Sequence, residues 1–149
     1  MLRAALAVLK EQGIAVQSAS KLITSLPLGP SRRRYANGAA VVKTDLLPDE
    51  LLDCLQRVEA HFGQRRGQRW GARVLDLDIV LWSGGAWGSP RLIIPHPAFR
   101  RRSFVITPAA AIAARWRDPI SGLTLRQLAA RQARRLTRPT PPRKRAPAW

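Results

Sequence analysis

The stretch RWGARVLDLDIVLW, residues 69–82, places two carboxylates, Asp76 and Asp78, inside a run of leucine, isoleucine and valine. Side chains of a strand alternate between its two faces, so an extended segment from Val74 to Trp82 has one apolar face and one face that carries both aspartates. The apolar face consists of Leu75, Leu77, Ile79 and Leu81. The two aspartate Cα atoms are then about 6.5 to 7 Å apart, at ~3.3 Å per residue. Such carboxylates repel each other unless a cation lies beside them.

Two interpretations of the aspartate pair remain open from these residues alone. Mg²⁺ binds one or two protein carboxylates and completes its octahedron with water and phosphate oxygens, so the pair is a candidate metal site for a polyanionic substrate. The alternative is a solvated strand face whose aspartates form ion pairs with arginines. Nearby arginines serve either interpretation and do not decide between them; they are Arg65, Arg66, Arg69, Arg73, Arg91, Arg100, Arg101 and Arg102.

Length and composition predict one globular domain. The chain has 149 residues, of which 46% are hydrophobic, and a domain of this length can bury about 70% of its unfolded surface. No apolar run reaches the ~18 residues of a membrane span, and residues 1–13 have the spacing of an amphipathic helix rather than of a secretory signal. We therefore expect a soluble, cytoplasmic protein. The single cysteine, Cys54, excludes an internal disulfide, and no Cys/His cluster has zinc-ligand spacing.

The charge is strongly basic and unevenly distributed. Twenty-six Lys and Arg residues against nine Asp and Glu give a net charge of +17, and no acidic residue follows Asp118. The Pro- and Arg-rich end has too little apolar content to fold alone. We expect a folded domain over residues 1–137 and a basic, disordered tail over residues 138–149. A solvated tail is the favoured interpretation, and contact with nucleic acid is the alternative.

The periodicity of apolar residues predicts an α+β fold with a mostly antiparallel sheet flanked by helices. In the first half of the chain, the predicted elements are a helix over 2–12 ended by Gly13, strands over 14–24 and 35–44, and a helix from Asp45 or Pro48 to Gly63. A strand over 74–82 follows, then a turn over 83–90 and a short strand over 91–95. The last predicted elements are an irregular or short helical stretch over 96–104, a turn of helix over 109–116 after Pro108, and a helix over 125–136 capped by Thr124.

Two motifs connect this pattern to a known family. The string RWGARVLDLDIVLW, followed by RLIIPHPAFRRRSFVITP, resembles the 6-hydroxymethyl-7,8-dihydropterin pyrophosphokinases of folate biosynthesis, which carry R-x-x-D-L-D-I and then L-x-[IV]-P-H-x5-R-x-F. The strings PLGP, YANGAA and LLDCLQRVEAHFG fall in the family's order, so the resemblance runs from about Met1 to Ile112. It implies a ferredoxin-like β-α-β-β-α-β fold and transfer of pyrophosphate from ATP to the hydroxymethyl oxygen of the pterin, with release of AMP.

The resemblance also implies roles for individual residues. Asp76 and Asp78 match the pair that binds two Mg²⁺ ions, and the implied catalytic residues are Asp76, Asp78, Arg66, Arg73 and Arg102. ATP-binding positions match Gln56, Glu59, Trp70, Arg73, Ile79, Arg91, Leu92, His96 and Arg102. Pterin-binding positions match Leu28, Tyr35, Asn37 and Phe104. The loop over 63–70 is one residue shorter than in common members, so either Arg65 or Arg66 fills the loop-arginine role.

The chain departs from the family pattern at its N-terminus. Members begin with a strand carrying an A-L-G-S-N-like motif, and this chain lacks it. We expect the chain to begin at an internal methionine of a longer reading frame, and loss of an internal strand to leave two neighbours with unpaired edges. In SRRRYANG, three arginines precede the aromatic residue, where the family tends to have acidic or amide residues.

The resemblance favours a monomeric enzyme with small-molecule substrates and no membrane partner. Two other interpretations carry distinct consequences. A basic nucleic-acid-binding module explains the charge but leaves the aspartate pair unexplained, because carboxylates repel phosphates unless metals intervene. The second alternative interpretation is a truncated pyrophosphokinase fold without activity.

Overall fold

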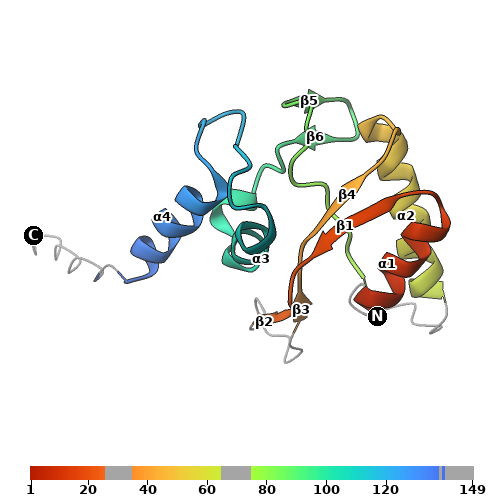
Figure 1. Cartoon of the computed structure of the whole chain (residues 1–149), viewed down its shortest axis with the longest axis horizontal. Helices are drawn as coiled ribbons and strands as arrows, with labels where there is room; N and C mark the ends of the chain where they lie inside the picture. Colours follow the sequence, from red (N-terminus) through yellow and green to blue (C-terminus); the bar gives the residue numbers. More distant parts are fainter. Residues whose placement is uncertain (26–34, 65–74, 138, 140–149) are drawn as a thin grey trace, which may run out of the picture.

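A two-stranded ribbon separates two layers of helices in the computed structural model, which describes residues 1–25, 35–64, 75–137 and 139 (Figure 1). The ribbon consists of β1 (Ala15–Ala19) and β4 (Ala40–Lys43), which pair antiparallel. On one side lie α1 (Leu2–Glu11) and α2 (Pro48–Gln64), and on the other α3 (Ser103–Ala113) and α4 (Leu125–Thr137).

Successive side chains of β4 point to opposite faces of the ribbon and reach two separate cores. Val42 packs against the first core, whereas Val41 packs against the second. The buried residues of the first core are Ala5, Leu9, Ile14, Cys54, Leu55, Val58 and Leu75. Those of the second core are Phe99, Ile106, Ala109, Ala113, Leu125 and Leu128. The ribbon therefore needs apolar residues on both faces, which the sequence AVV supplies.

The first helix has the predicted form. Ala5 and Leu9 are buried, and Leu2 and Leu6 are partly buried against the same core, as the helical spacing of these residues predicts. Gly13 follows the helix with a φ of 83°, and its N–H donates to the carbonyl of Lys10 at 3.1 Å. Glycine readily adopts the left-handed backbone conformation that commonly follows a helix, so the predicted end of this helix is confirmed.

The two long strands predicted over 14–24 and 35–44 are each broken in two, which corrects the prediction. The first gives β1 and β2 (Ile23–Ser25), and the second gives β3 (Tyr35–Asn37) and β4. β2 and β3 form their own antiparallel pair. At the break, Ala39 N–H donates to Ser20 Oγ at 2.9 Å, while Ser20 N–H donates to the carbonyl of Ala39 at 2.8 Å. A serine side chain thus replaces one backbone acceptor, and the strand ladder is interrupted there.

The strand predicted over 74–82 is not formed in its described part. Burial alternates from residue 75 to residue 79 as it does in an extended strand, but no strand among the described residues pairs with residues 75–81. Two of their backbone groups bind elsewhere: Leu77 N–H donates to Glu59 Oε1, and the carbonyl of Val80 accepts from His96 N–H at 3.0 Å. Alternation alone predicts an extended backbone, but a strand also requires a neighbouring strand to pair with.

The region after this segment forms a small hairpin that leads into the second helical layer. β5 (Trp87–Gly88) lies within the predicted turn and pairs antiparallel with β6 (Ile93–Ile94), which confirms the predicted short strand. The 3₁₀ helix η1 (Phe99–Arg101) confirms the predicted short helical stretch. Phe99 is fully buried and anchors this connection in the second core.

Two helices run further than predicted. α2 continues through Gly63, and α3 begins at Ser103 and includes Pro108. Proline lacks an N–H and is disfavoured inside helices, but here burial of Pro108 together with Ile106 and Ala109 outweighs the missing hydrogen bond.

α4 has its predicted cap: Thr124 Oγ1 accepts from Gln127 N–H at 3.2 Å, and Gln127 Oε1 accepts from Thr124 N–H at 2.9 Å.

The α+β class is confirmed, and every strand pair among the described residues is antiparallel. The described strands form three two-stranded sheets rather than the single sheet that was expected. No helix in the described ranges is long and apolar enough to cross a membrane. The predicted tail over 138–149 lies outside the described residues, apart from Pro139.

Candidate functional site

The predicted two-faced arrangement around the aspartate pair is present. Asp76 and Asp78 are exposed, whereas Leu75 is buried in the first core and Leu77 and Ile79 pack against it. Leu81 instead packs against the second core, together with Val80, which corrects its assignment to the same face. Both carboxylates are therefore accessible to solvent from a segment whose apolar side chains anchor it.

A side chain of α2 fixes the backbone between the two aspartates. Glu59 Oε1 accepts the N–H of Leu77 at 2.6 Å. A hydrogen bond to a charged acceptor is about twice as strong as a neutral one. Glu59, a predicted ATP-contacting residue, thus positions the aspartate segment in addition to any contact of its own with a ligand.

The donor chemistry of the aspartate pair fits a hard divalent cation. Carboxylate oxygens are preferred ligands of Mg²⁺, which retains several waters and needs only one or two protein carboxylates. Within the part of the chain that the structure describes, no group of three or more His, Cys, Asp and Glu residues could hold a metal ion. The pair suits a cation that shares its coordination sphere with a bound phosphate.

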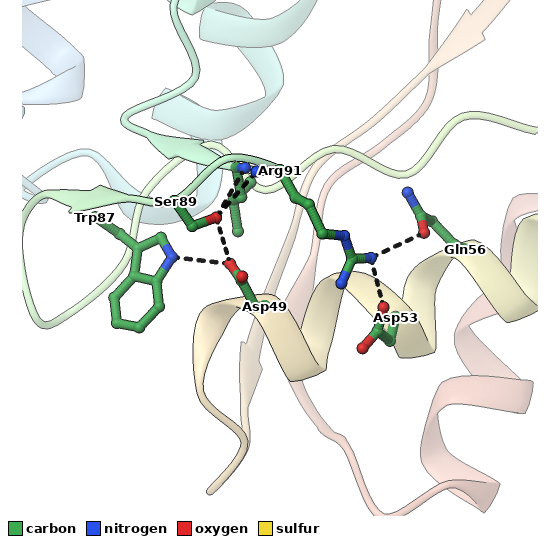
Figure 2. A network of polar contacts seen from close by, with 7 residues as sticks. Asp49, Asp53, Gln56, Trp87, Ser89 and Arg91 are labelled. Atoms are coloured by element: carbon green, nitrogen blue, oxygen red, sulfur yellow. Dashed lines mark hydrogen bonds and ion pairs between the residues drawn. The ribbon is translucent and has the colours of Figure 1, made fainter.

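The guanidinium of Arg91 lies on α2 beside a predicted ATP-contacting residue. Its Nη2 donates to Asp53 Oδ1 at 2.5 Å and to Gln56 Oε1 at 3.3 Å. Figure 2 shows Asp53 and Gln56 projecting from the same side of α2 toward Arg91. The hydrogen bond from Arg91 holds the pKa of the Asp53 carboxyl below its usual range. Arg91 and Gln56, both predicted from the family resemblance, are therefore brought together.

A second set of contacts fixes the hairpin that carries Arg91. Asp49 Oδ1 accepts from Trp87 Nε1 and from Ser89 Oγ, each at 2.9 Å (Figure 2). Ser89 Oγ in turn accepts from the N–H groups of Arg91 at 3.2 Å and Leu92 at 3.1 Å. One carboxylate at the start of α2 thus holds the backbone of two predicted ATP-binding residues.

His96 is oriented by its own backbone neighbours. Its N–H donates to the carbonyl of Val80 at 3.0 Å, and its Nδ1 accepts from Ala98 N–H at 3.1 Å. Because Nδ1 is an acceptor in this geometry, Nε2 carries the proton of the neutral ring and is left as a donor. His96 is thereby tied to the segment of Asp76 and Asp78 through Val80.

Arg102 and Phe104 lie together at the start of α3. The guanidinium carbon of Arg102 is 5.8 Å from the centroid of the Phe104 ring, within the range of a cation–π contact. α3 packs against β3, the strand that carries Asn37. The described part of the predicted pterin set therefore lies on two elements that contact each other.

An ion pair between a partly buried arginine and a buried aspartate stabilises the connection that follows His96. Arg100 Nε and Nη2 donate to Asp118 Oδ2 at 2.6 Å and Oδ1 at 2.7 Å. Asp118 is fully buried and also accepts from Ile120 N–H and Ser121 Oγ. The hydrogen bonds from Arg100 hold the pKa of the Asp118 carboxyl far below its usual range. This pair joins η1 to the loop between α3 and α4.

Several predicted site residues cannot be placed. Leu28, Arg65, Arg66, Trp70 and Arg73 lie outside the described residues, and only the backbone of Tyr35 is described. These predictions stay predictions.

Sequence reasoning missed the residues that position the site. The sequence pattern gives Asp49 and Asp53 no role beyond their place in a predicted helix, and it places Trp87 and Ser89 in a predicted turn. The available signal was the spacing of Asp49, Asp53 and Gln56, which places one polar stripe on α2. Nothing in the spacing indicated that the stripe binds the hairpin.

A sequence model described as "7,8-dihydro-6-hydroxymethylpterin-pyrophosphokinase (HPPK)" matches residues 1–114. That range contains every described residue to which the family resemblance assigns a role in the site.

Three curated relatives carry the name 2-amino-4-hydroxy-6-hydroxymethyldihydropteridine pyrophosphokinase. The protein from Synechocystis sp. is 41% identical over 116 residues, which cover 78% of this chain and 60% of the relative. The Pseudomonas aeruginosa protein is 45% identical over 101 residues, which cover 67% of this chain and 62% of the relative. The Bacillus subtilis protein is 37% identical over 113 residues, which cover 74% of this chain and 68% of the relative. The chain thus spans about three fifths of the length of the first two relatives.

Proposed function

The chain belongs to the 7,8-dihydro-6-hydroxymethylpterin-pyrophosphokinase family, and on this premise we propose that it transfers pyrophosphate from ATP to the hydroxymethyl oxygen of 6-hydroxymethyl-7,8-dihydropterin. The products are AMP and the pterin diphosphate, an intermediate of folate biosynthesis. The observation that carries the proposal is the exposed pair Asp76 and Asp78 on a segment anchored by Leu75 and fixed by Glu59.

Asp76 and Asp78 are the proposed ligands of two Mg²⁺ ions. When bound, the ions would neutralise charge on the ATP phosphates and on the group in transfer. The protein's part in such a reaction is mostly positioning and electrostatic stabilisation. Fixing the backbone at Leu77 serves this purpose, because it restricts how far the two carboxylates can separate.

The proposed ATP contacts come from α2, from the hairpin and from the segments next to them. Gln56 and Glu59 project from α2, Arg91 and Leu92 belong to the hairpin, and His96 follows it; Ile79, Arg102, Trp70, Arg66 and Arg73 complete the set. The contact of Arg91 with Gln56 supports a common site for α2 and the hairpin. The donor orientation of His96 Nε2 and the cationic groups of Arg91 and Arg102 suit phosphate oxygens.

The proposed pterin contacts are Asn37, Phe104, Tyr35 and Leu28. An aromatic ring binds a flat heterocycle by stacking, and an amide can pair with both donors and acceptors on its edge. The packing of α3 against β3 supports the shared location of Phe104 and Asn37. We also propose that the protein is cytoplasmic and monomeric and has no nucleic-acid partner.

The test is AMP release, followed by chromatography, from the purified protein with ATP, Mg²⁺ and 6-hydroxymethyl-7,8-dihydropterin. The matched control is the Asp76→Asn/Asp78→Asn variant, which keeps side-chain size and removes both charges. Pterin-dependent AMP that disappears in the control supports the proposal. AMP formation that does not depend on the pterin, or that survives in the control, contradicts it.

A further inference from the structure

The head group of Arg91 is held by two acceptors on α2, and both use the same nitrogen. Asp53 Oδ1 and Gln56 Oε1 each accept from Nη2, at 2.5 and 3.3 Å (Figure 2). The Arg91 and Asp53 side chains are 46% and 47% exposed. This ion pair therefore lies at the surface, where a ligand can reach it and replace either partner.

The use of Nη2 determines what Arg91 can offer to a ligand. A guanidinium has two edges that bind a phosphate or carboxylate bidentately, one formed by Nε and Nη2 and the other by Nη1 and Nη2. Both edges include Nη2, and its two hydrogens are directed to Asp53 and Gln56 in this arrangement. Bidentate binding of a phosphate by Arg91 thus requires at least one of these contacts to break.

The backbone of Arg91 is fixed separately from its head group. Its N–H donates to Ser89 Oγ, which donates to Asp49 Oδ1 one turn before Asp53 on the same helix. The hairpin can therefore stay attached to α2 while the guanidinium changes partner. A long side chain on a fixed backbone can turn by rotamer changes alone.

We infer that Asp53 is a positioning residue that holds Arg91 on α2 in the ATP-free protein and releases it to a phosphate of bound ATP. The inference rests on the proposed function, because Arg91 is a proposed ATP contact. The Asp53 carboxylate and a phosphate compete for one cation. Asp53 consequently lowers the affinity for ATP, and it does so through Arg91.

The test is a double-mutant cycle on nucleotide affinity. Isothermal titration calorimetry with Mg²⁺ and a non-hydrolysable ATP analogue gives the Kd of four proteins: wild type, Asp53→Asn, Arg91→Ala and the double variant. We expect Asp53→Asn to bind the analogue about two- to fivefold more tightly than wild type, as the loss of an exposed competing ion pair predicts. In the Arg91→Ala background the same substitution should leave Kd unchanged within error.

The control for general charge is Glu11→Gln, which removes an exposed carboxylate from α1 and should not alter Kd. Unchanged or weaker binding by Asp53→Asn overturns the inference, and so does equal tightening in the Arg91→Ala background, which would reveal only long-range repulsion. Pterin-dependent AMP release combined with either result leaves the proposed function standing. A wild-type protein that does not bind the analogue overturns both.

Discussion

The carboxylate of Glu59 accepts the backbone N–H of Leu77 at 2.6 Å, and Leu77 is the residue between Asp76 and Asp78. This contact joins the fourth turn of α2 to the segment that carries both aspartates. Since no described strand pairs with residues 75–81, Glu59 supplies a hydrogen bond that a neighbouring strand would otherwise provide. The position of the aspartate pair therefore depends on a side chain rather than on a sheet.

We predict that Glu59→Ala lowers the rate of AMP formation about tenfold, a loss of roughly 1.4 kcal/mol of transition-state stabilisation. The alanine leaves Leu77 N–H without its acceptor and lets the two carboxylates separate. Glu59→Gln keeps an acceptor oxygen and should lose less activity. Steady-state kinetics at varied Mg²⁺ measures this, and equal losses in the two variants would show that the charge of Glu59, not its position, matters.

Asp76 and Asp78 are expected to act as a pair. Either single substitution to asparagine should lower AMP formation by about two to three orders of magnitude, because removal of one charge-stabilising group at a reacting centre costs roughly that much. The double variant should lose little more than either single variant. Binding of Mn²⁺, followed by its electron paramagnetic resonance signal, should weaken in parallel. Independent, multiplying losses would contradict a shared site.

Ser89 should affect nucleotide binding more than chemistry. Ser89→Ala removes the acceptor for Arg91 and Leu92 N–H and the donor to Asp49. The hairpin then stays attached to α2 through Trp87 and the Arg91 head group, but the backbone at Arg91 and Leu92 is no longer fixed. We expect KM for ATP to rise about three- to tenfold with kcat nearly unchanged, the pattern of a lost binding interaction. Ser89→Thr keeps the hydroxyl and should restore the wild-type KM. A fall in kcat alone would contradict this role.

The helices and the aspartate face could be predicted from the sequence because each depends on local rules. The spacing of Ala5 and Leu9, the glycine at 13 and the box of Thr124 and Gln127 all act within a few residues. Alternation placed Asp76 and Asp78 opposite Leu75 for the same reason.

The parts that could not be predicted depend on contacts distant in sequence. At the break in the strand ladder, Ser20 bonds to Ala39, nineteen residues away, and a strand pattern carries no sign of this contact. The missing strand at 75–81 depends on which segments lie beside it. The contact between Asp53 and Arg91 spans 38 residues, so spacing on α2 identifies the acceptor but not its donor.

Asp118 should be essential for the stability of the second core. Asp118→Asn leaves Arg100 without a charged partner and disrupts a bidentate pair in a buried position. We expect a loss of about 1.5–3 kcal/mol in the free energy of unfolding, because hydrogen bonds to a charged group contribute roughly this much and Arg100 is only partly buried. Ser121→Ala removes one hydrogen bond from the same carboxylate and should cost about 1 kcal/mol. Urea unfolding measures both, and equal losses would contradict a dominant role of Arg100.

The same carboxylate predicts how stability changes with acid. The pKa of Asp118 in the folded protein lies far below its usual value, because Arg100 and Ser121 bind the ionised form. In the unfolded chain the pKa of an aspartate is about 3.9, so below that pH the unfolded state takes up a proton that the folded state does not. The contribution of Asp118 is therefore complete above about pH 5 and shrinks as the pH falls through 4 toward the folded pKa.

Asp118→Asn cannot gain or lose this proton, so its unfolding free energy should depend less steeply on pH than that of the wild type. We expect the difference between the two proteins to be largest at pH 6 to 7 and to decrease by about 1 kcal/mol or more by pH 3. Urea unfolding at pH 7, 5, 4 and 3 tests this, with Ser121→Ala as the control that retains the titrating group. A difference that stays constant over this range would mean that the wild-type carboxyl has an ordinary pKa, and that Arg100 does not hold it in the ionised form.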